Sequence, residues 1–172
     1  IFKKFTKNKI NNTNQLYGYA DVVLDGGTIE HVFNLQNCFY NLFNFIKVGG
    51  RIIHFSPSSN YIDHGFYMFS PTFFIDFYTA NNFEINTIQI YRHKNNIKSD
   101  WEIFDYVQGS LQRVSMGGLD ASMYGIICIV TKQKESTWNK IPYQGMYIKG
   151  HWAEGEYFSH KNVELENSID PN

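Results

Sequence analysis

The sequence predicts an α/β fold in which a parallel sheet carries helices on its faces. Two observations lead to this class. Strand-like runs near residues 21–25, 51–56 and 83–92 alternate with two stretches, 29–47 and 71–81, whose apolar residues recur every three or four positions. Short joints marked by glycine or proline separate these runs. Strands that alternate with helices through short joints are typical of parallel sheets.

Each predicted strand has its own signature. Residues 21–25 form a short apolar run bounded by polar residues, which is typical of a strand covered on both faces. The run 51–56 predicts a second buried strand that ends at Pro57, and 83–92 predicts a strand of mixed polarity. The most apolar run of the chain, Tyr124–Val130, predicts the last strand.

The two predicted helices have recognisable ends. In 29–47, Thr28 is placed to cap the start, and Lys47 with Gly49-Gly50 is placed to close the end. Ser70-Pro71 combines a capping residue with a proline in the first turn, which predicts a helix start there. The polar stretch 93–118 predicts at most a short helix around Trp101.

Composition indicates one packed domain. Of the 172 residues, 43% are hydrophobic and 17% aromatic, which is enough for a substantial core. We expect an irregular lead-in over 1–18, the α/β domain over 19–134, and an irregular cover and tail over 135–172.

Charge and cysteine content restrict the class of function. The net charge of −1 and the absence of a basic stripe disfavour nucleic acid as a partner. No apolar run approaches the roughly 20 residues that a membrane span needs, so we expect no membrane partner. Cys38 and Cys128 lie in apolar patterns, which predicts reduced thiols in a cytoplasmic protein.

Three ordered segments resemble the second half of class I S-adenosylmethionine-dependent methyltransferases, which have a Rossmann-like sheet. The segments read YADVVLDGGTIEHVFN, then FIKVGGRIIHFSPSSNYIDHGFYMFSP, then FFIDFYTANNFEI. The family pattern has a strand ending in an acidic or small residue, a Glu-His at a helix start, a Lys-x-Gly-Gly turn, and a loop that reaches a histidine. The match covers about residues 19–92, with a plausible last strand at 124–132.

The resemblance implies a cofactor and a reaction. The cofactor would be S-adenosylmethionine, and its methyl group would pass to a small-molecule acceptor by in-line displacement. Asp25, Gly27 and Thr28 stand where the family loop passes the methionine end of the cofactor. A purely structural role as turn and helix cap remains open for the same residues.

The resemblance also implies a substrate side. His64 and His31 are the candidate catalytic residues, with His64 placed to take a proton from the acceptor or, alternatively, to fix its loop. Four residues of the loop after the second strand are candidates for substrate binding: Asn60, Tyr61, Phe66 and Tyr67. His54, in the middle of a strand, is expected to be a core histidine with its polar atoms satisfied.

We expect no metal site. Some relatives bind magnesium through a Glu-x-x-Glu-His set, but Gly27 occupies the first position of that set here. A metal-dependent hydrolase built on His31, Asp63 and His64 is a weaker alternative, because the chain has no H-x-H or H-E-x-x-H spacing.

The chain also departs from the family pattern. No Gly-x-Gly-x-Gly turn follows a strand, so the half that grips the cofactor would be missing. In the family the sheet order is strands three, two, one, four, five, seven and six, which would make 21–25 a central strand. We therefore expect a fragment of a longer protein, or a second chain that covers the exposed edge of 21–25. The alternative function is a non-catalytic methyltransferase-like interaction module.

Overall fold

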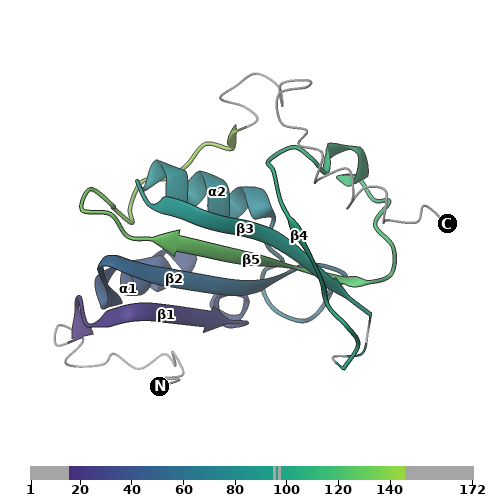
Figure 1. Ribbon diagram of the computed structural model, residues 1–172, viewed down its shortest axis with the longest axis horizontal. Coiled ribbons are helices and arrows are strands. Elements are labelled where there is room, and N and C mark those ends of the chain that lie inside the picture. The colour runs from purple at the N-terminus through teal and green to yellow at the C-terminus, as the bar shows by residue number, and fades with distance from the viewer. Residues whose placement is uncertain (1–15, 95, 97, 146–172) are drawn as a thin grey trace.

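The computed structural model describes residues 16–94, 96 and 98–145 (Figure 1). Its described part is an α/β structure with one five-stranded sheet and two α-helices. The strands are β1 (Ala20–Gly26), β2 (Ile46–Ser59), β3 (Glu84–His93), β4 (Glu102–Asp105) and β5 (Met123–Thr131). The helices are α1 (Leu35–Phe45) and α2 (Pro71–Ala80), with short 3-10 turns η2 (Ile29–His31) and η3 (Gln112–Val114).

The sheet is mixed, so the prediction of a wholly parallel sheet is wrong. Its order is β1-β2-β5-β3-β4. β1 runs parallel to β2, whereas β5 runs antiparallel to both of its neighbours and β4 antiparallel to β3. Parallel neighbours require a crossover connection, usually a helix. Between β3 and β5 the described residues contain β4 and the three-residue turn η3 but no α-helix, and β5 runs in the opposite direction to β3.

β1 forms one edge of the described sheet, as the sequence predicts. It pairs with β2 alone, with Val22 opposite Arg51 and Leu24 opposite Ile53. On this edge strand the side chains of Val22 and Leu24 are about half exposed, at 55% and 48%. An edge strand with exposed apolar side chains can pair with a further strand.

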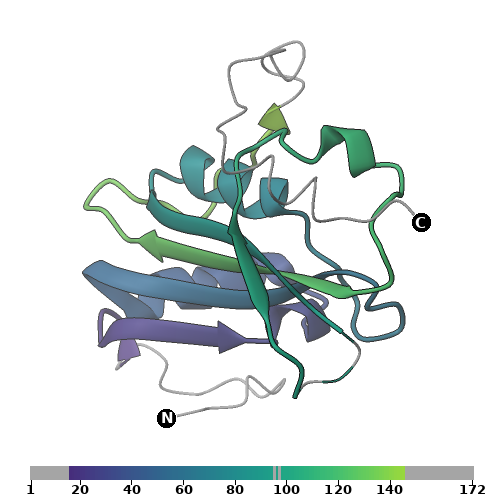
Figure 2. The same cartoon turned by 45° about the vertical axis from the view of Figure 1, so that its right-hand side comes forward.

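Both α-helices pack on the same face of the sheet (Figures 1 and 2). The ring centroids of Phe39 on α1 and Phe77 on α2 are 4.2 Å apart, which brings the two helices into contact over the sheet. Buried side chains from both helices and from β2 and β5 form the main core between these layers. Cys38 and Cys128 lie in this core as free thiols, and burial raises the pKa of Cys38 to about 12.

The predicted helix over 29–47 is shorter and starts later. Residues 29–31 form the turn η2, Val32 is extended, and α1 begins only at Leu35. The side chain of Asn34, rather than Thr28, caps α1 by accepting a hydrogen bond from the Asn37 backbone N–H at 3.0 Å. The turn η2 is separate from α1 because the Asp25 carboxylate accepts hydrogen bonds from the backbone N–H groups of Thr28 and Ile29.

The predicted end of this helix is also wrong. α1 stops at Phe45, and Gly49-Gly50 lie inside β2. The ammonium group of Lys132, which follows β5, donates hydrogen bonds to the carbonyl oxygens of Phe43 and Ile46 at 2.8 and 3.2 Å. Lys132, from a distant part of the chain, therefore satisfies carbonyl groups at the C-terminus of α1, where Gly49-Gly50 were expected to cap the helix.

The second helix and the last two predicted strands are confirmed. The Ser70 hydroxyl caps α2 by accepting from the Thr72 N–H, and Pro71 occupies its first turn. β3 and β5 cover the predicted ranges within one residue at each end. The short helix expected around Trp101 is wrong: β4 lies there instead. Arg92 on β3 holds it through an ion pair of 2.6 Å with Glu102.

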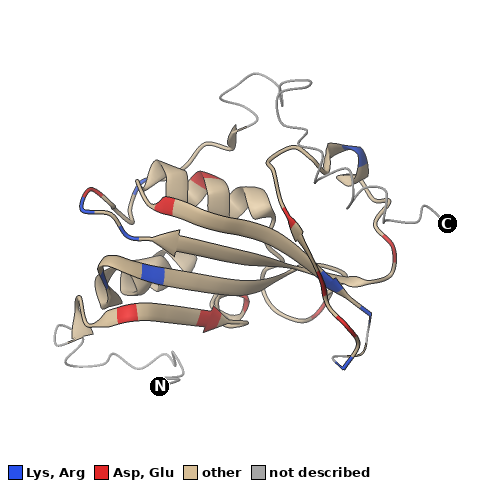
Figure 3. Cartoon of the chain, viewed as in Figure 1, with Lys and Arg blue, Asp and Glu red and all other residues tan. Residues whose placement is uncertain are grey.

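The described C-terminal segment packs against the end of α2. The Asn81 side chain accepts hydrogen bonds from the Thr137 hydroxyl and the Lys140 N–H, at 2.9 and 3.0 Å. Residues 1–15 of the expected lead-in and 146–172 of the expected cover and tail lie outside the described residues. Lysine and arginine are scattered over the described elements (Figure 3), and none of the described helices is long and apolar enough to cross a membrane.

Candidate functional site

Two polar corners meet at the carboxyl ends of β1 and β2. The first corner, 25–31, includes the end of β1 and the turn η2, and the second is the loop 60–70, between β2 and α2. The backbone carbonyl of Glu30 accepts hydrogen bonds from the N–H groups of Phe66 and Tyr67, at 2.8 and 3.2 Å. The corners meet because β1 and β2 are parallel neighbours, whose carboxyl ends lie at the same edge of the sheet.

Asp25 is at the centre of a closed hydrogen-bond network. One carboxylate oxygen accepts from the backbone N–H groups of Thr28 and Ile29, at 3.1 and 3.2 Å. The other lies 2.6 Å from Nδ1 of His54, whose Nε2 lies 2.6 Å from the Tyr78 hydroxyl. Asp25 is 4% exposed and His54 is fully buried. Both oxygens of Asp25 therefore have partners inside the protein, and the expected role of His54 as a satisfied core histidine is confirmed.

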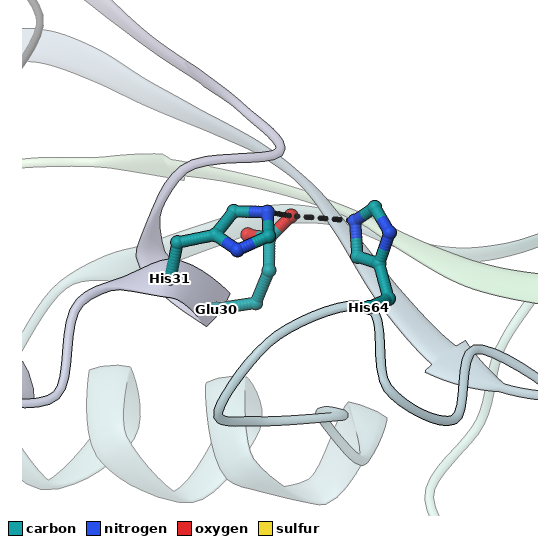
Figure 4. A group of neighbouring side chains, drawn as sticks. All are labelled: Glu30, His31 and His64. Carbon is teal, nitrogen blue, oxygen red and sulfur yellow. Dashed lines mark ion pairs between the residues drawn. The ribbon is translucent and has the colours of Figure 1, made fainter.

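Glu30 is also buried, but its surroundings differ from those of Asp25. Its side chain is fully buried, and neither of its carboxylate oxygens has a hydrogen-bond partner in the described part of the chain. Nε2 of His31 lies 3.7 Å and Nε2 of His64 lies 3.6 Å from its Oε1 (Figure 4). Those separations are too long for hydrogen bonds. The two histidine side chains are about half exposed, so this cluster connects a buried carboxylate to the surface.

Two glycines make room for this carboxylate. A Cβ at Gly65 would lie 2.9 Å from the backbone oxygen and 3.1 Å from Cγ of Glu30. Gly27 has φ of +72°, and a Cβ there would lie 3.2 Å from Oε1 of Glu30. The loop after β2 can close over Glu30 because residue 65 has no side chain.

The structure brings the two candidate catalytic residues together. The rings of His31 and His64 are 5.0 Å apart between centroids, although 32 positions in the chain lie between them. Among the described residues, the three that group closely enough to hold a metal ion are Glu30, His31 and His64, with their ligand atoms within 4.8 Å of one another. Asp63, which the hydrolase alternative used, is exposed and is not in this group.

Three of the four candidate substrate residues surround this cluster. The Tyr61 ring lies 5.5 Å from that of His64, and its hydroxyl lies 3.0 Å from Nε2 of His93. Phe66, 64% exposed, packs edge-to-face against Phe33 at 5.5 Å. The Tyr67 hydroxyl donates to the Phe33 carbonyl at 2.8 Å. Tyr61 therefore lies directly beside an exposed histidine, whereas Phe66 and Tyr67 contact Phe33 and bind the Glu30 carbonyl through their backbone N–H groups.

Asn60 has a structural position. Its side-chain amide donates to the carbonyl oxygens of Asp120 and Ser122, at 2.9 and 2.6 Å, and its φ is +65°. It therefore fixes the start of the loop to the segment before β5. Its amide nitrogen already has two partners, which leaves its side-chain oxygen for any contact with a substrate.

Two tyrosines lie close to the cluster, the partly buried Tyr61 and the buried Tyr91. Burial raises the pKa of Tyr61, while a hydrogen bond involving Tyr91 lowers it. Burial raises the pKa of Tyr91 most, and the nearby Tyr61 and the Glu30 charge raise it further. Both phenols are therefore neutral at ordinary pH, and each keeps a proton that it can donate.

Glu30 is not among the candidate site residues that the sequence predicts. The sequence pattern places it only as the glutamate of a Glu-His pair at a helix start. Its burial depends on η2 ending after three residues and on Gly65 closing over it. No pattern around residue 30 indicates either event.

Comparison with known proteins adds no relative to this description. No protein-family model matches the chain, and no curated protein matches it either. The functional argument therefore rests on the strand order and on the geometry of the corner.

Proposed function

We propose that this chain is the acceptor-side half of a Rossmann-like, S-adenosylmethionine-dependent methyltransferase domain. One observation carries the proposal, namely the order of four strands in the sheet. If β1, β2, β3 and β5 are numbered four, five, six and seven, the observed order β1-β2-β5-β3 reads four, five, seven, six. This is the order of the same strands in the family that the sequence resembles. The agreement supports the proposal because β5, the last strand in the chain, inserts between β2 and β3.

The open edge of β1 supports the same numbering. In the family order, strand one lies beside strand four, so the half that grips the cofactor would pair with the free side of β1. The exposed Val22 and Leu24 are suited to such pairing. The proposal therefore includes a cofactor-binding half that pairs with β1. That half would belong either to a longer form of this chain or to a second chain.

The corner at the ends of β1 and β2 is the proposed reaction site. S-adenosylmethionine would lie against residues 25–28, with Gly27 and Thr28 in contact with its methionine end. Asp25 would take part through its backbone, because its carboxylate is occupied by Thr28, Ile29 and His54. In sheets of this kind, ligands lie beyond the carboxyl ends of the strands.

The chemistry requires few protein groups. The acceptor atom attacks the methyl carbon in line, the carbon–sulfur bond breaks, and its electron pair neutralises the sulfonium. The proton of a hydroxyl or amine acceptor passes to an imidazole nitrogen, for which His64 and His31 are the exposed candidates. Alignment of the two reactants supplies most of the acceleration. Tyr61, Phe66 and Tyr67 would hold a small-molecule acceptor, and the two buried free thiols favour a cytoplasmic location.

Calorimetric titration of the full-length protein with S-adenosylmethionine tests the proposal. We expect one binding site with an affinity in the range of about 1–100 µM, comparable to ordinary enzyme substrates. His64→Ala is expected to leave this affinity unchanged and to slow methyl transfer, whereas Glu84→Gln, at a surface glutamate hydrogen-bonded to Asn86 and Gln133, changes neither. If no heat is released at millimolar cofactor, the methyltransferase assignment is wrong and a non-catalytic module is the better account.

A further inference from the structure

The burial of Glu30 without a partner requires compensation. A carboxylate removed from water is strongly unfavourable unless a hydrogen-bond donor or a cation replaces the lost hydration. Within the described chain neither oxygen of Glu30 has a hydrogen-bond donor, and ring nitrogens of His31 and His64 lie 3.7 and 3.6 Å from Oε1. The space between these three side chains is where a cation would compensate the charge (Figure 4).

We propose that Glu30, His31 and His64 bind one divalent first-row transition-metal ion, with Zn²⁺ as the reference ion. Zn²⁺ binds imidazole nitrogen and carboxylate oxygen at about 2.0–2.2 Å, which places neighbouring ligand atoms about 3–3.5 Å apart. The observed separations from Oε1 are slightly longer, and the whole group fits within 4.8 Å. Coordination requires the ligand atoms to close by up to about an ångström, and both histidine rings are about half exposed, which leaves them room to move.

The ligand set determines which ion is preferred. Two imidazole nitrogens and one carboxylate oxygen suit Zn²⁺, Mn²⁺ or Fe²⁺, whereas Mg²⁺ prefers an all-oxygen shell. No carboxylate is available at position 27, because Gly27 has no side chain and a Cβ there would lie 3.2 Å from Oε1 of Glu30. The site therefore selects a transition metal over magnesium.

The same geometry leaves coordination positions open. Three protein ligands are fewer than any of these ions requires, so water or an oxygen atom of a small ligand completes the shell. The open coordination positions face the surface, where His31 and His64 are about half exposed. The Tyr61 ring packs beside His64 there, and the Phe66 ring is exposed. This metal site does not require methyl transfer, but it shares His31 and His64 with it, and a ring nitrogen that binds the ion does not also take the proton of an acceptor.

Calorimetry on the full-length protein, stripped with EDTA and dialysed, tests the site with ZnCl₂ and MgCl₂. We expect one Zn²⁺ per chain, bound at least 100-fold more tightly than Mg²⁺. His31→Ala and His64→Ala should each weaken the Zn²⁺ affinity at least 10-fold. His93→Ala, which removes a histidine that is hydrogen-bonded to Tyr61 and the Lys94 carbonyl, should not change it.

The carboxylate ligand has its own matched pair of variants. Glu30→Gln should abolish the tight site, and Glu84→Gln, at a surface glutamate hydrogen-bonded to Asn86 and Gln133, should retain it. Circular dichroism in EDTA shows whether Glu30→Gln folds; if it does not, the two histidine variants decide the question alone. Three results would overturn the proposal: no stoichiometric Zn²⁺ binding, equal affinity for Mg²⁺, or Zn²⁺ binding that survives in both His31→Ala and His64→Ala.

Discussion

Two buried carboxylates, five positions apart in the same corner, have opposite surroundings. Asp25 accepts two backbone hydrogen bonds and pairs with His54, which continues to Tyr78. Glu30 is equally buried, yet its carboxylate has no hydrogen bond within the described chain. The protein therefore supplies every partner that the first carboxylate needs and leaves the second facing two exposed imidazoles.

This difference assigns a structural role to Asp25 and leaves Glu30 free to bind a ligand. The Asp25 network connects β1, β2 and α2 through one continuous chain of hydrogen bonds, so it fixes the geometry of the turn. Glu30 contributes its backbone carbonyl to the loop after β2, but its side chain contributes nothing comparable to the fold. A buried group without a structural partner is a candidate for ligand binding.

The largest expected effect is at Asp25. Asp25→Ala leaves two backbone N–H groups and His54 without their partner, all in buried positions. Removal of one member of a buried pair costs about 3–5 kcal/mol. Urea unfolding should show a loss of that size in the free energy of unfolding, and a loss below 1 kcal/mol, typical of a surface pair, would contradict the structural role.

A smaller loss is expected at the glycine that closes over Glu30. Gly65→Ala places a methyl group 2.9 Å from a backbone oxygen, so the loop must shift. Overpacking of this kind costs about 1–3 kcal/mol. Gly26→Ala is the matched control, because a Cβ at Gly26 has no atom within 4 Å. Equal stability of the two variants in urea unfolding would show that the loop does not close as described.

Tyr78, at the far end of the Asp25 network, is expected to contribute less to stability. Tyr78→Phe keeps the buried ring and removes only the hydroxyl, which lies 2.6 Å from Nε2 of His54. The loss of one buried hydrogen bond that leaves its partner unsatisfied costs about 1–2 kcal/mol. The thermal midpoint should fall accordingly, and an unchanged midpoint would mean that the network ends at His54.

The smallest effect is expected at Glu30 itself. In the metal-free protein, Glu30→Gln removes no hydrogen bond, because the carboxylate makes none. Loss of an uncompensated charge offsets the cost of a buried amide, so the free energy of unfolding should change by less than about 1 kcal/mol. A loss in urea unfolding as large as that of Asp25→Ala would show that Glu30 has a structural role after all.

Much of the fold could be predicted from local sequence patterns. The apolar run Tyr124–Val130 and the Ser70-Pro71 start of α2 give the correct elements, because each depends on neighbouring residues alone. The end of α1 could not be predicted, since its carbonyl groups are satisfied by Lys132, far away in the chain. β4 was missed for the same reason: its ion pair and its ladder both come from β3.

In the site, too, features that depend on nearby residues could be predicted and features that depend on distant residues could not. The meeting of the two corners and the core role of His54 could be predicted from the strand order and from the position of His54 in mid-strand. The importance of Glu30 could not, because its burial is produced by a loop that begins about 30 positions later and closes through Gly65. Sequence patterns located the site but did not identify its buried carboxylate.

The most direct test of the central claim, that Glu30 is buried in order to bind a ligand, is anomalous diffraction. Crystals of the full-length protein grown with ZnCl₂ would be measured on both sides of the zinc absorption edge. The account predicts one anomalous peak in this corner, about 2.0–2.2 Å from a Glu30 oxygen and from the Nε2 atoms of His31 and His64. A map without that peak, in which a histidine instead bonds directly to the Glu30 carboxylate, would contradict it.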